Sequence, residues 1–132
     1  MVVSDDMANG LSLRKPELVP GESPGRLRYR FFIQQNEREY EKVEGVLSVK
    51  VYGVNGDREI SYSLADLSPD FDSKAATLHF RYFQGIEGEL VLPEGFVPEG
   101  ISLLARVTKP HATEVKEQFP WALQERFINV GK

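Results

Sequence analysis

Residues 43–64, VEGVLSVKVYGVNGDREISYSL, decide the fold class of this chain. Apolar or small residues occupy every second position before the central VNGD and again after it. A period of two is typical of a strand with one buried face. Asn55-Gly56 tolerates the positive φ angles of a type I′ turn, whose twist matches the flanking strands, so we predict a β-hairpin with its turn there. The alternating residues are Val43, Gly45, Leu47, Val49 and Val51 before the turn and Ile60, Tyr62 and Leu64 after it.

The same period recurs on both sides of this hairpin. In residues 27–33 the apolar side chains fall on one face and Arg26, Arg28 and Arg30 on the other, with Phe32 as the exception. We predict a strand there and in three further alternating segments. The apolar residues of those segments are Leu11 and Leu13, then Ala76, Leu78, Phe80 and Tyr82, and finally Ile101, Leu103, Ala105 and Val107.

Three segments are rich in turn-forming residues. Residues 65–74, ADLSPDFDSK, are dense in Asp, Ser and Pro and are predicted as a loop. Two glycines in QGIEG, residues 84–88, indicate a turn from which the chain folds back as a strand. The following LPEGFVPEG, residues 92–100, is interpreted as an irregular crossover that holds Phe96 in the core.

The segment TEVKEQFPWALQERFIN, residues 113–129, admits two interpretations. Val115 and Phe119 alternate as in a strand, which Pro120 would confine to a sheet edge or end. Alternatively, WALQERFIN forms one short C-terminal helix. Both interpretations remain open.

The pattern as a whole favours an all-β fold. Short strands separated by turn signals, without a long amphipathic helix, are typical of an antiparallel sandwich or barrel, and we predict an antiparallel β-sandwich of about seven or eight short strands. The PGESPG segment at residues 20–25 is interpreted as a hairpin or inter-sheet connection, because the apolar alternation continues on both sides of it. A chain of 132 residues can bury one core. We therefore expect a single domain over residues 1–132.

Composition and charge exclude several classes of protein. The chain contains no cysteine, which rules out disulfides, zinc sites built from thiolates and cysteine nucleophiles. Its formal net charge of -4 disfavours nucleic acid as a partner, because proteins that bind the phosphate backbone carry a basic excess. No apolar stretch approaches the about 20 residues that span a bilayer. We expect a soluble domain that does not itself insert into a membrane.

No motif indicates catalysis or a cofactor. Glu87 and Glu89 would point to the same side of one strand, whereas a glycosidase needs two carboxyl groups that face each other across the substrate. His79 and His111 lack the spacing of metal ligands, and neither a nucleophile elbow nor a phosphate-binding loop is present. We predict no catalytic, cofactor-binding or metal-binding residues, and that the protein is not an enzyme. A hydrolase is the weakest of the functions considered.

The one local feature that suggests an interaction surface is a row of basic residues. Arg26, Arg28 and Arg30 repeat at strand period, and His79 and Arg81 would lie beside them if the two strands pair. Three like charges on one face repel one another unless acids or a partner neutralise them. We expect the acids of residues 36–44, NEREYEKVE, to neutralise them within the chain. The alternative is that they bind an acidic partner.

Over residues 11–121 the sequence resembles the C-terminal soluble domain of an uncharacterised family of proteobacterial proteins, known as a domain of unknown function. The order LRYRFFIQQNE, EGVLSVKVYGVNGD, SLADL, LHFRYFQGIEGELVLPEGFVPEGISL and FPW carries the resemblance. Its most specific part is Phe83-Gln84, Glu87-Gly88-Glu89-Leu90, Leu92-Pro93, Gly95-Phe96 and Pro98.

The resemblance implies a location rather than an activity. In that family the domain follows a single N-terminal membrane helix and a coiled coil, neither of which is present in this chain. The family offers no catalytic residues to transfer. It implies a structural or protein-interaction module of the cell envelope on the periplasmic side of the inner membrane, with a protein partner there. The alternative is a sandwich that binds carbohydrate or peptidoglycan, which exposed aromatic residues would favour, although only Tyr40 and Tyr52 are expected outside the core.

Overall fold

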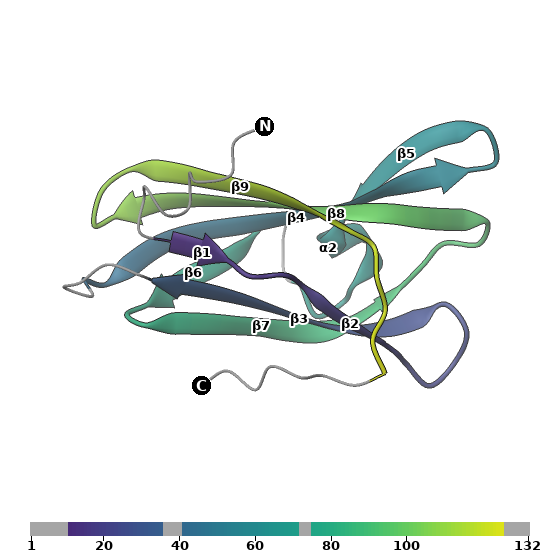
Figure 1. The fold of residues 1–132 in the computed structure, drawn as a ribbon, viewed down its shortest axis with the longest axis horizontal. Helices are drawn as coiled ribbons and strands as arrows, with labels where there is room; N and C mark the ends of the chain where they lie inside the picture. Colours follow the sequence, from purple (N-terminus) through teal and green to yellow (C-terminus); the bar gives the residue numbers. More distant parts are fainter. Residues whose placement is uncertain (1–10, 36–40, 72–74, 126–132) are drawn as a thin grey trace.

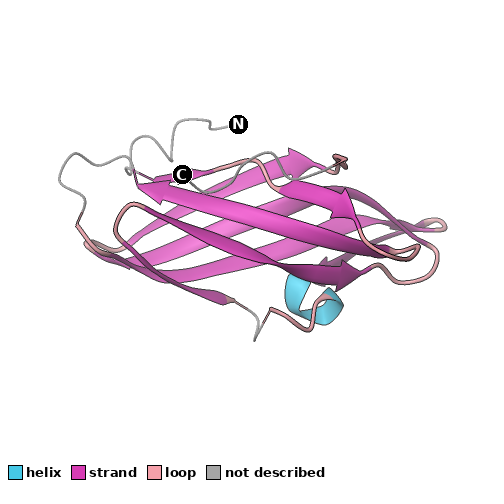
Figure 2. Cartoon of the chain, turned by 90° about the horizontal axis from the view of Figure 1, so that it is seen from below, coloured by secondary structure: helices cyan, strands magenta, loops and turns pink. Residues whose placement is uncertain are grey.

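The computed structural model describes residues 11–35, 41–71 and 75–125. Over these residues the chain forms nine β-strands and one short helix. The strands make two antiparallel sheets that pack face to face, and the helix lies beside them at the edge of the sandwich (Figures 1 and 2). The predicted antiparallel all-β sandwich is therefore confirmed, with more strands than predicted.

The two sheets are each organised around one long central strand. Sheet I contains β1 (Leu11–Leu13), β2 (Glu17–Pro20), β3 (Arg26–Gln35) and β7 (Phe83–Val91). In sheet I, β1 and β2 pair with one edge of β3 and β7 pairs with the other. Sheet II contains β4 (Val43–Asn55), β5 (Arg58–Ser63), β6 (Ala76–Phe80), β8 (Phe96–Lys109) and β9 (Thr113–Pro120). In sheet II, β5 and β6 share one edge of β4, while β8 pairs with the other edge and with β9.

The core lies between the sheets, where the alternating residues of the long strands meet. Residues predicted to face inward are buried in β3, β4 and β8. They include Leu27, Tyr29, Phe31 and Ile33 from β3, Leu47, Val49 and Val51 from β4, and Ile101, Leu103, Ala105 and Val107 from β8. Phe32, the exception in the pattern, is also buried although its neighbours on both sides point inward.

β4 and β5 form the predicted hairpin, but its turn is displaced along the chain. Asn55 pairs with Arg58, so that Gly56 and Asp57 occupy the central positions of the turn. Gly56 has a φ angle of 65°, which residues with a Cβ atom adopt rarely. The hairpin is thus confirmed, and the prediction that Asn55 is a central residue of its turn is wrong.

The turn predicted at residues 84–88 is not formed. β7 runs through these residues without interruption, and the chain reverses at Arg81 and Tyr82 instead. Tyr82 is therefore 58% exposed rather than part of the core. A Cβ atom on Gly85 would lie only 2.9 Å from the Phe32 ring, so this glycine permits close packing within a strand.

Two segments predicted to be irregular contain regular structure. β8 begins at Phe96, inside the predicted crossover, and Phe96 is buried as expected. The predicted loop at residues 65–74 overlaps the helix α2 (Leu64–Leu67). Ser63 caps this helix, since its side chain accepts a hydrogen bond from Ala65 N and its own N–H is directed at the Asp66 carboxylate.

At the C-terminal end the structure selects the strand interpretation. β9 is a strand that ends at Pro120 on the edge of sheet II, with Val115 buried. Residues 121–125 form no helix, and residues 126–129 of the predicted helix lie outside the described residues. The PGESPG segment connects β2 to β3 as a hairpin, in which Gly21 N donates to Arg26 O.

Side chains and the C-terminal segment link the edges of the two sheets. Gln84 of β7 donates from Nε2 to Thr77 O (2.9 Å) and accepts from His79 N (2.8 Å), so it bonds the free edge of β6 in the opposite sheet. On the other side of the sandwich, Gln124 N donates to Leu18 O of β2 (2.7 Å) after the chain has left β9. Such links protect strand edges from pairing with other chains.

Candidate interaction site

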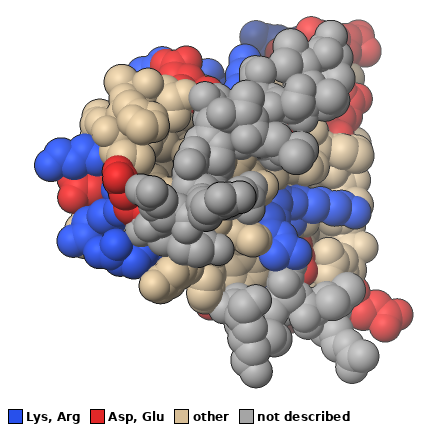
Figure 3. Space-filling model, turned by 60° about the vertical axis from the view of Figure 1, so that its left-hand side comes forward, with Lys and Arg blue, Asp and Glu red and all other residues tan. Residues whose placement is uncertain are grey.

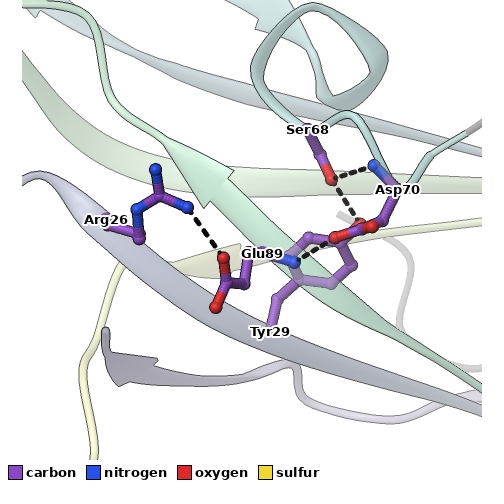
Figure 4. Close-up of polar contacts among 5 residues, drawn as sticks. All are labelled: Arg26, Tyr29, Ser68, Asp70 and Glu89. Carbon is purple, nitrogen blue, oxygen red and sulfur yellow. Dashed lines mark hydrogen bonds and ion pairs between the residues drawn. The ribbon is translucent and has the colours of Figure 1, made fainter. Parts of the chain in front are cut away.

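The arginines of β3 lie beside the glutamates of β7 on the outer face of sheet I. In the strand register, Arg30 is opposite Glu87 and Arg28 is opposite Glu89. Arg30 Nη2 lies 3.4 Å from Glu87 Oε1. Figure 4 shows the other ion pair, in which Arg26 Nη1 lies 2.9 Å from Glu89 Oε1. The second ion pair is diagonal, which long side chains can span. We call Arg26, Arg28, Arg30, Glu87 and Glu89 the charge ladder.

The acids beside the arginines are not those that the sequence suggested. Residues 36–40 of the expected acidic segment lie outside the described residues. Glu44, from the same segment, lies in sheet II with its Oε2 atom 3.7 Å from His79 Nε2. β7 supplies the neutralising carboxylates instead, because it pairs with β3 along the whole of the arginine row.

The five basic residues singled out in the sequence do not form one surface. β6, which carries His79, pairs with β4 and not with β3. Arg81 lies in the turn between β6 and β7, where its carbonyl oxygen accepts a hydrogen bond from Gln35 Nε2 (2.6 Å). Arg26, Arg28 and Arg30 thus remain together on sheet I, while His79 belongs to the opposite sheet.

The ladder borders a hollow at the surface of the sandwich. The hollow measures about 510 Å³ and is lined by Arg28, Tyr29, Asp70, Glu87, Gly88 and Glu89. Asp70 follows α2 in the chain, and its Oδ2 atom accepts a hydrogen bond from Glu89 N on the edge of β7 (2.9 Å). Asp70 N is itself bonded to Ser68 Oγ (3.2 Å), so the loop is fastened to sheet I (Figure 4).

Tyr29 connects this loop to the core. Its hydroxyl forms a hydrogen bond with Ser68 Oγ at 2.8 Å, and its ring stacks on Phe31 with centroids 5.1 Å apart. Burial raises the pKa of the Tyr29 hydroxyl above its ordinary value. The hydrogen bond between this hydroxyl and Ser68 Oγ opposes the shift, and the nearby Asp70 carboxylate adds to it. The tyrosine is therefore held in its neutral form beneath the hollow.

Gly88 makes this arrangement possible. A Cβ atom there would lie 2.6 Å from the Tyr29 hydroxyl oxygen and 2.7 Å from Asp70 Cβ. Ser68 and Asp70 were not among the predicted site residues, because loop residues carry no periodic signal in the sequence. They are tied to the ladder strands by the hydrogen bonds of Ser68 Oγ with the Tyr29 hydroxyl and of Asp70 Oδ2 with Glu89 N.

The arrangement offers charges rather than reactive groups. Glu87 and Glu89 lie on the same face of one strand, and each is within ion-pair distance of an arginine. Over the described residues no three His, Cys, Asp or Glu side chains gather as metal ligands would. What the ladder can do is present alternating positive and negative groups on a rigid sheet, with about two fifths of the Glu89 side chain exposed (39%).

A second surface feature is the pair of aromatic residues where β6 turns into β7. Tyr82 and Phe83 are 58% and 44% exposed, and the Phe83 ring lies 6.3 Å from that of Phe32. The sequence placed Tyr82 in the core, so this pair was missed. Figure 3 brings forward the end of the sandwich that lies at the left in Figure 1, where basic and acidic side chains lie next to each other among uncharged residues.

Comparison with known proteins gives one match. A family model described as a family of unknown function (DUF6776) matches residues 1–103, which include all residues of the charge ladder and Asp70. No curated protein and no solved structure matches the chain. Within the described part of the chain, no helix has the length and apolar character needed to span a bilayer.

Proposed function

The chain belongs to this family of unknown function, DUF6776, and from that premise we propose that it is a non-catalytic structural or protein-interaction module of the bacterial cell envelope. Its location would be the periplasmic side of the inner membrane. The resemblance to domains that follow a membrane helix and a coiled coil supports this location. The partner would be another envelope protein.

The observation that carries the proposal is the charge ladder. Arg26 and Glu89 are held in place by each other, yet their side chains remain 45% and 39% exposed. Exposed ion pairs of this kind contribute only about 0 to 1 kcal/mol to folding. Charges that stabilise the fold so little are available to bind a partner. A fixed pattern of charges makes such binding specific and association fast.

The same geometry supports a non-catalytic role. A pair of carboxyl groups that act on a glycosidic bond must flank the substrate from two sides. Glu87 and Glu89 instead project from one strand toward Arg30 and Arg26. We predict no turnover of glycosides, esters or phosphates by the purified domain, with or without added divalent metal ions.

The test is retention of an envelope protein at low salt. Immobilised parent domain and the double variant Arg28→Ala/Arg30→Ala are each exposed to solubilised envelope, and bound proteins are identified by mass spectrometry. We expect a salt-sensitive partner that the parent retains and the variant loses, while the melting temperature changes little. Val46→Ala, on the outer face of sheet II, serves as the control and should retain the partner. Equal retention by parent and double variant would reject the ladder as the binding surface.

The alternative function, binding of carbohydrate or peptidoglycan, has one observation in its favour. Tyr82 and Phe83 are adjacent and exposed, and flat aromatic side chains give binding sites large contact area at low entropic cost. Co-sedimentation with purified cell-wall sacculi tests it. Binding that disappears in Tyr82→Ala/Phe83→Ala but persists in Arg28→Ala/Arg30→Ala would favour this alternative over the proposed function.

Localisation needs its own test in a bacterium that carries the protein. We expect a protease added from outside to degrade the domain once the outer membrane is permeabilised, while a cytoplasmic marker stays intact. Protection of the domain until the inner membrane is lysed would contradict the periplasmic location.

A further inference from the structure

β5 presents an open strand edge at the far end of sheet II. One edge of β5 pairs with β4. Along the other edge, the backbone groups of Glu59 and Ser61 make no hydrogen bond to the described residues. In Figure 1 the β4–β5 hairpin extends away from the rest of the sandwich, and no drawn segment runs along the outer side of β5. The β6 edge, by contrast, is bonded by the Gln84 side chain.

The hairpin geometry defines which backbone groups this edge exposes. Asn55 and Arg58 close a two-residue turn, so the groups of Arg58, Ile60 and Tyr62 point toward β4. Those of Glu59 and Ser61 point outward, because hydrogen-bonding direction alternates along an antiparallel strand. Ser63 agrees with this alternation, since its N–H is directed away from β4 at the Asp66 carboxylate (3.3 Å). The available edge is therefore confined to Glu59 and Ser61.

We infer that β5 pairs antiparallel with β5 of a second copy of this chain, with Ile60 opposite Ile60 of that copy. In this register Glu59 of each copy lies opposite Ser61 of the other copy. Each Glu59–Ser61 pair exchanges two backbone hydrogen bonds. Sheet II would then continue from one copy into the next.

The side chains favour this register over its neighbours. A shift toward the turn would place Glu59 opposite Glu59, where like charges repel. A shift the other way would require the N–H of Ser63, which is already engaged by the helix cap. In the register we infer, Arg58 faces Tyr62 of the other copy on the same side of the sheet, and a guanidinium is attracted to an aromatic face. Ile60 pairs with Ile60 on that side.

A scan with single cysteines tests both the contact and its register. The chain has no native cysteine, so each variant carries one thiol. Opposite residues of a non-hydrogen-bonded pair lie at a Cα separation compatible with a disulfide. Under mild oxidation Ile60→Cys should form disulfide-linked dimers several-fold faster than Glu59→Cys or Ser61→Cys. Faster linkage of either control variant, or equal rates for all three, would overturn the inferred pairing.

A proline variant tests the pairing without any cross-link. Ser61→Pro removes an N–H that points away from β4, which an edge strand tolerates. Sedimentation velocity over a series of concentrations should show the parent associating to a dimer and Ser61→Pro remaining monomeric, with matching circular dichroism spectra. A parent that stays monomeric at every concentration, or a Ser61→Pro variant that still dimerises, would overturn the inference. If the parent is monomeric, the strand that pairs with this edge would have to come from another protein.

This inference does not depend on the charge ladder. β5 lies in sheet II and the ladder lies in sheet I. If the arginine variants lose envelope retention but still dimerise, the inferred dimer is unaffected. If Ser61→Pro loses dimerisation but retains the envelope partner, the proposed function is unaffected.

Discussion

Tyr29 of β3 lies opposite Gly88 of β7. Because Gly88 has no side chain, the Tyr29 hydroxyl occupies the space that a Cβ atom at residue 88 would need. The tyrosine is fully buried, and its hydroxyl bonds to Ser68 at 2.8 Å. A buried hydroxyl needs such a partner, because leaving it unsatisfied costs about 1 to 3 kcal/mol. These residues hold the loop that carries Asp70 against the ladder.

We expect Gly88→Ala to destabilise the domain by about 1 to 3 kcal/mol, because the added methyl group would overpack a filled site. The Cβ atom would meet the Tyr29 hydroxyl oxygen and Asp70 Cβ, neither of which can move without breaking a hydrogen bond. Urea denaturation of parent and variant measures the change. Val91→Ala, an exposed position of the same strand, is the control. A Gly88→Ala midpoint equal to that of the parent would show that the two strands are not packed in this register.

The raised pKa of Tyr29 predicts how stability changes in alkali. A group whose pKa is higher in the folded state stabilises the fold below its unfolded pKa, and that contribution is lost as the pH rises through the folded value. The free energy of unfolding should therefore fall as the pH rises beyond the ordinary value of 10.0. Tyr29→Phe should be less stable at neutral pH by about 0.5 to 1.5 kcal/mol, because the hydrogen bond between the Tyr29 hydroxyl and Ser68 Oγ is lost while Ser68 Oγ keeps its bond from Asp70 N. It should also lose less stability in alkali, and an identical pH dependence of both proteins would contradict the assignment.

At the scale of strands and turns, the period of two was sufficient to predict β3, β4, β5 and β8. β3, β4 and β8 each bury one face, and β5 packs the partly buried Ile60 and Tyr62 against the core. It was not sufficient to predict which strands pair. Residues 26–30 and 87–91 lie far apart in the chain, and the two glycines between Phe83 and Leu90 are equally compatible with a turn and with a strand beside large side chains. The helix α2 was not predicted, because the residues around it are rich in Asp, Ser and Pro, which is typical of a loop. Ser63 and Asp66 have the spacing of a capping box, which is the signal for a helix start in this segment.

The candidate site was also predictable only in part, since the sequence indicated its arginines but not its acidic residues. The arginine row follows from strand period alone, and the structure keeps Arg26, Arg28 and Arg30 on one face. Its acidic neighbours depend on a contact between distant strands, and Asp70 depends on the path of a loop. Neither has a local signal in the sequence.

The turn of the β4–β5 hairpin can be tested through Gly56. Replacing it with valine should cost on the order of 1 to 3 kcal/mol, because a β-branched residue at positive φ is strained. Asparagine tolerates this conformation, so Gly56→Asn should cost less. The space around Gly56 is open, with no atom within 4 Å of a built Cβ, so backbone conformation alone produces the effect. Equal denaturation midpoints for the valine and asparagine variants would contradict this account of the turn.

The link between β6 and β7 can be tested through Gln84. Gln84→Ala removes two hydrogen bonds to the backbone of β6, and each such bond contributes about 0.5 to 1.5 kcal/mol. We expect faster amide hydrogen exchange at His79, whose N–H loses its acceptor, and unchanged exchange at Val115 in the distant strand β9. NMR-detected exchange measures both, and protection of the His79 amide in the variant would contradict the link.

At the scale of the whole molecule, the two surfaces that we propose for contacts lie in different sheets. The outer face of sheet I carries the charge ladder, the hollow borders the ladder where Asp70 meets β7, and the open edge of β5 lies in sheet II. The remaining edges of β6 and β7 near the ladder are bonded by Gln84 and Asp70. Under the two proposals, the domain pairs with a copy of itself through β5 and still offers the ladder to an envelope partner.

The central claim is that the charges of the ladder serve recognition more than folding, and neutralising one ion pair tests it most directly. Arg26→Gln/Glu89→Gln removes both charges of the diagonal pair and keeps a polar side chain at each position. Retention of the envelope partner is measured at several salt concentrations, together with the melting temperature. We predict a stability change of no more than about 1 kcal/mol and loss of the salt-sensitive retention. A variant that retains the partner with the same salt dependence as the parent would contradict the claim.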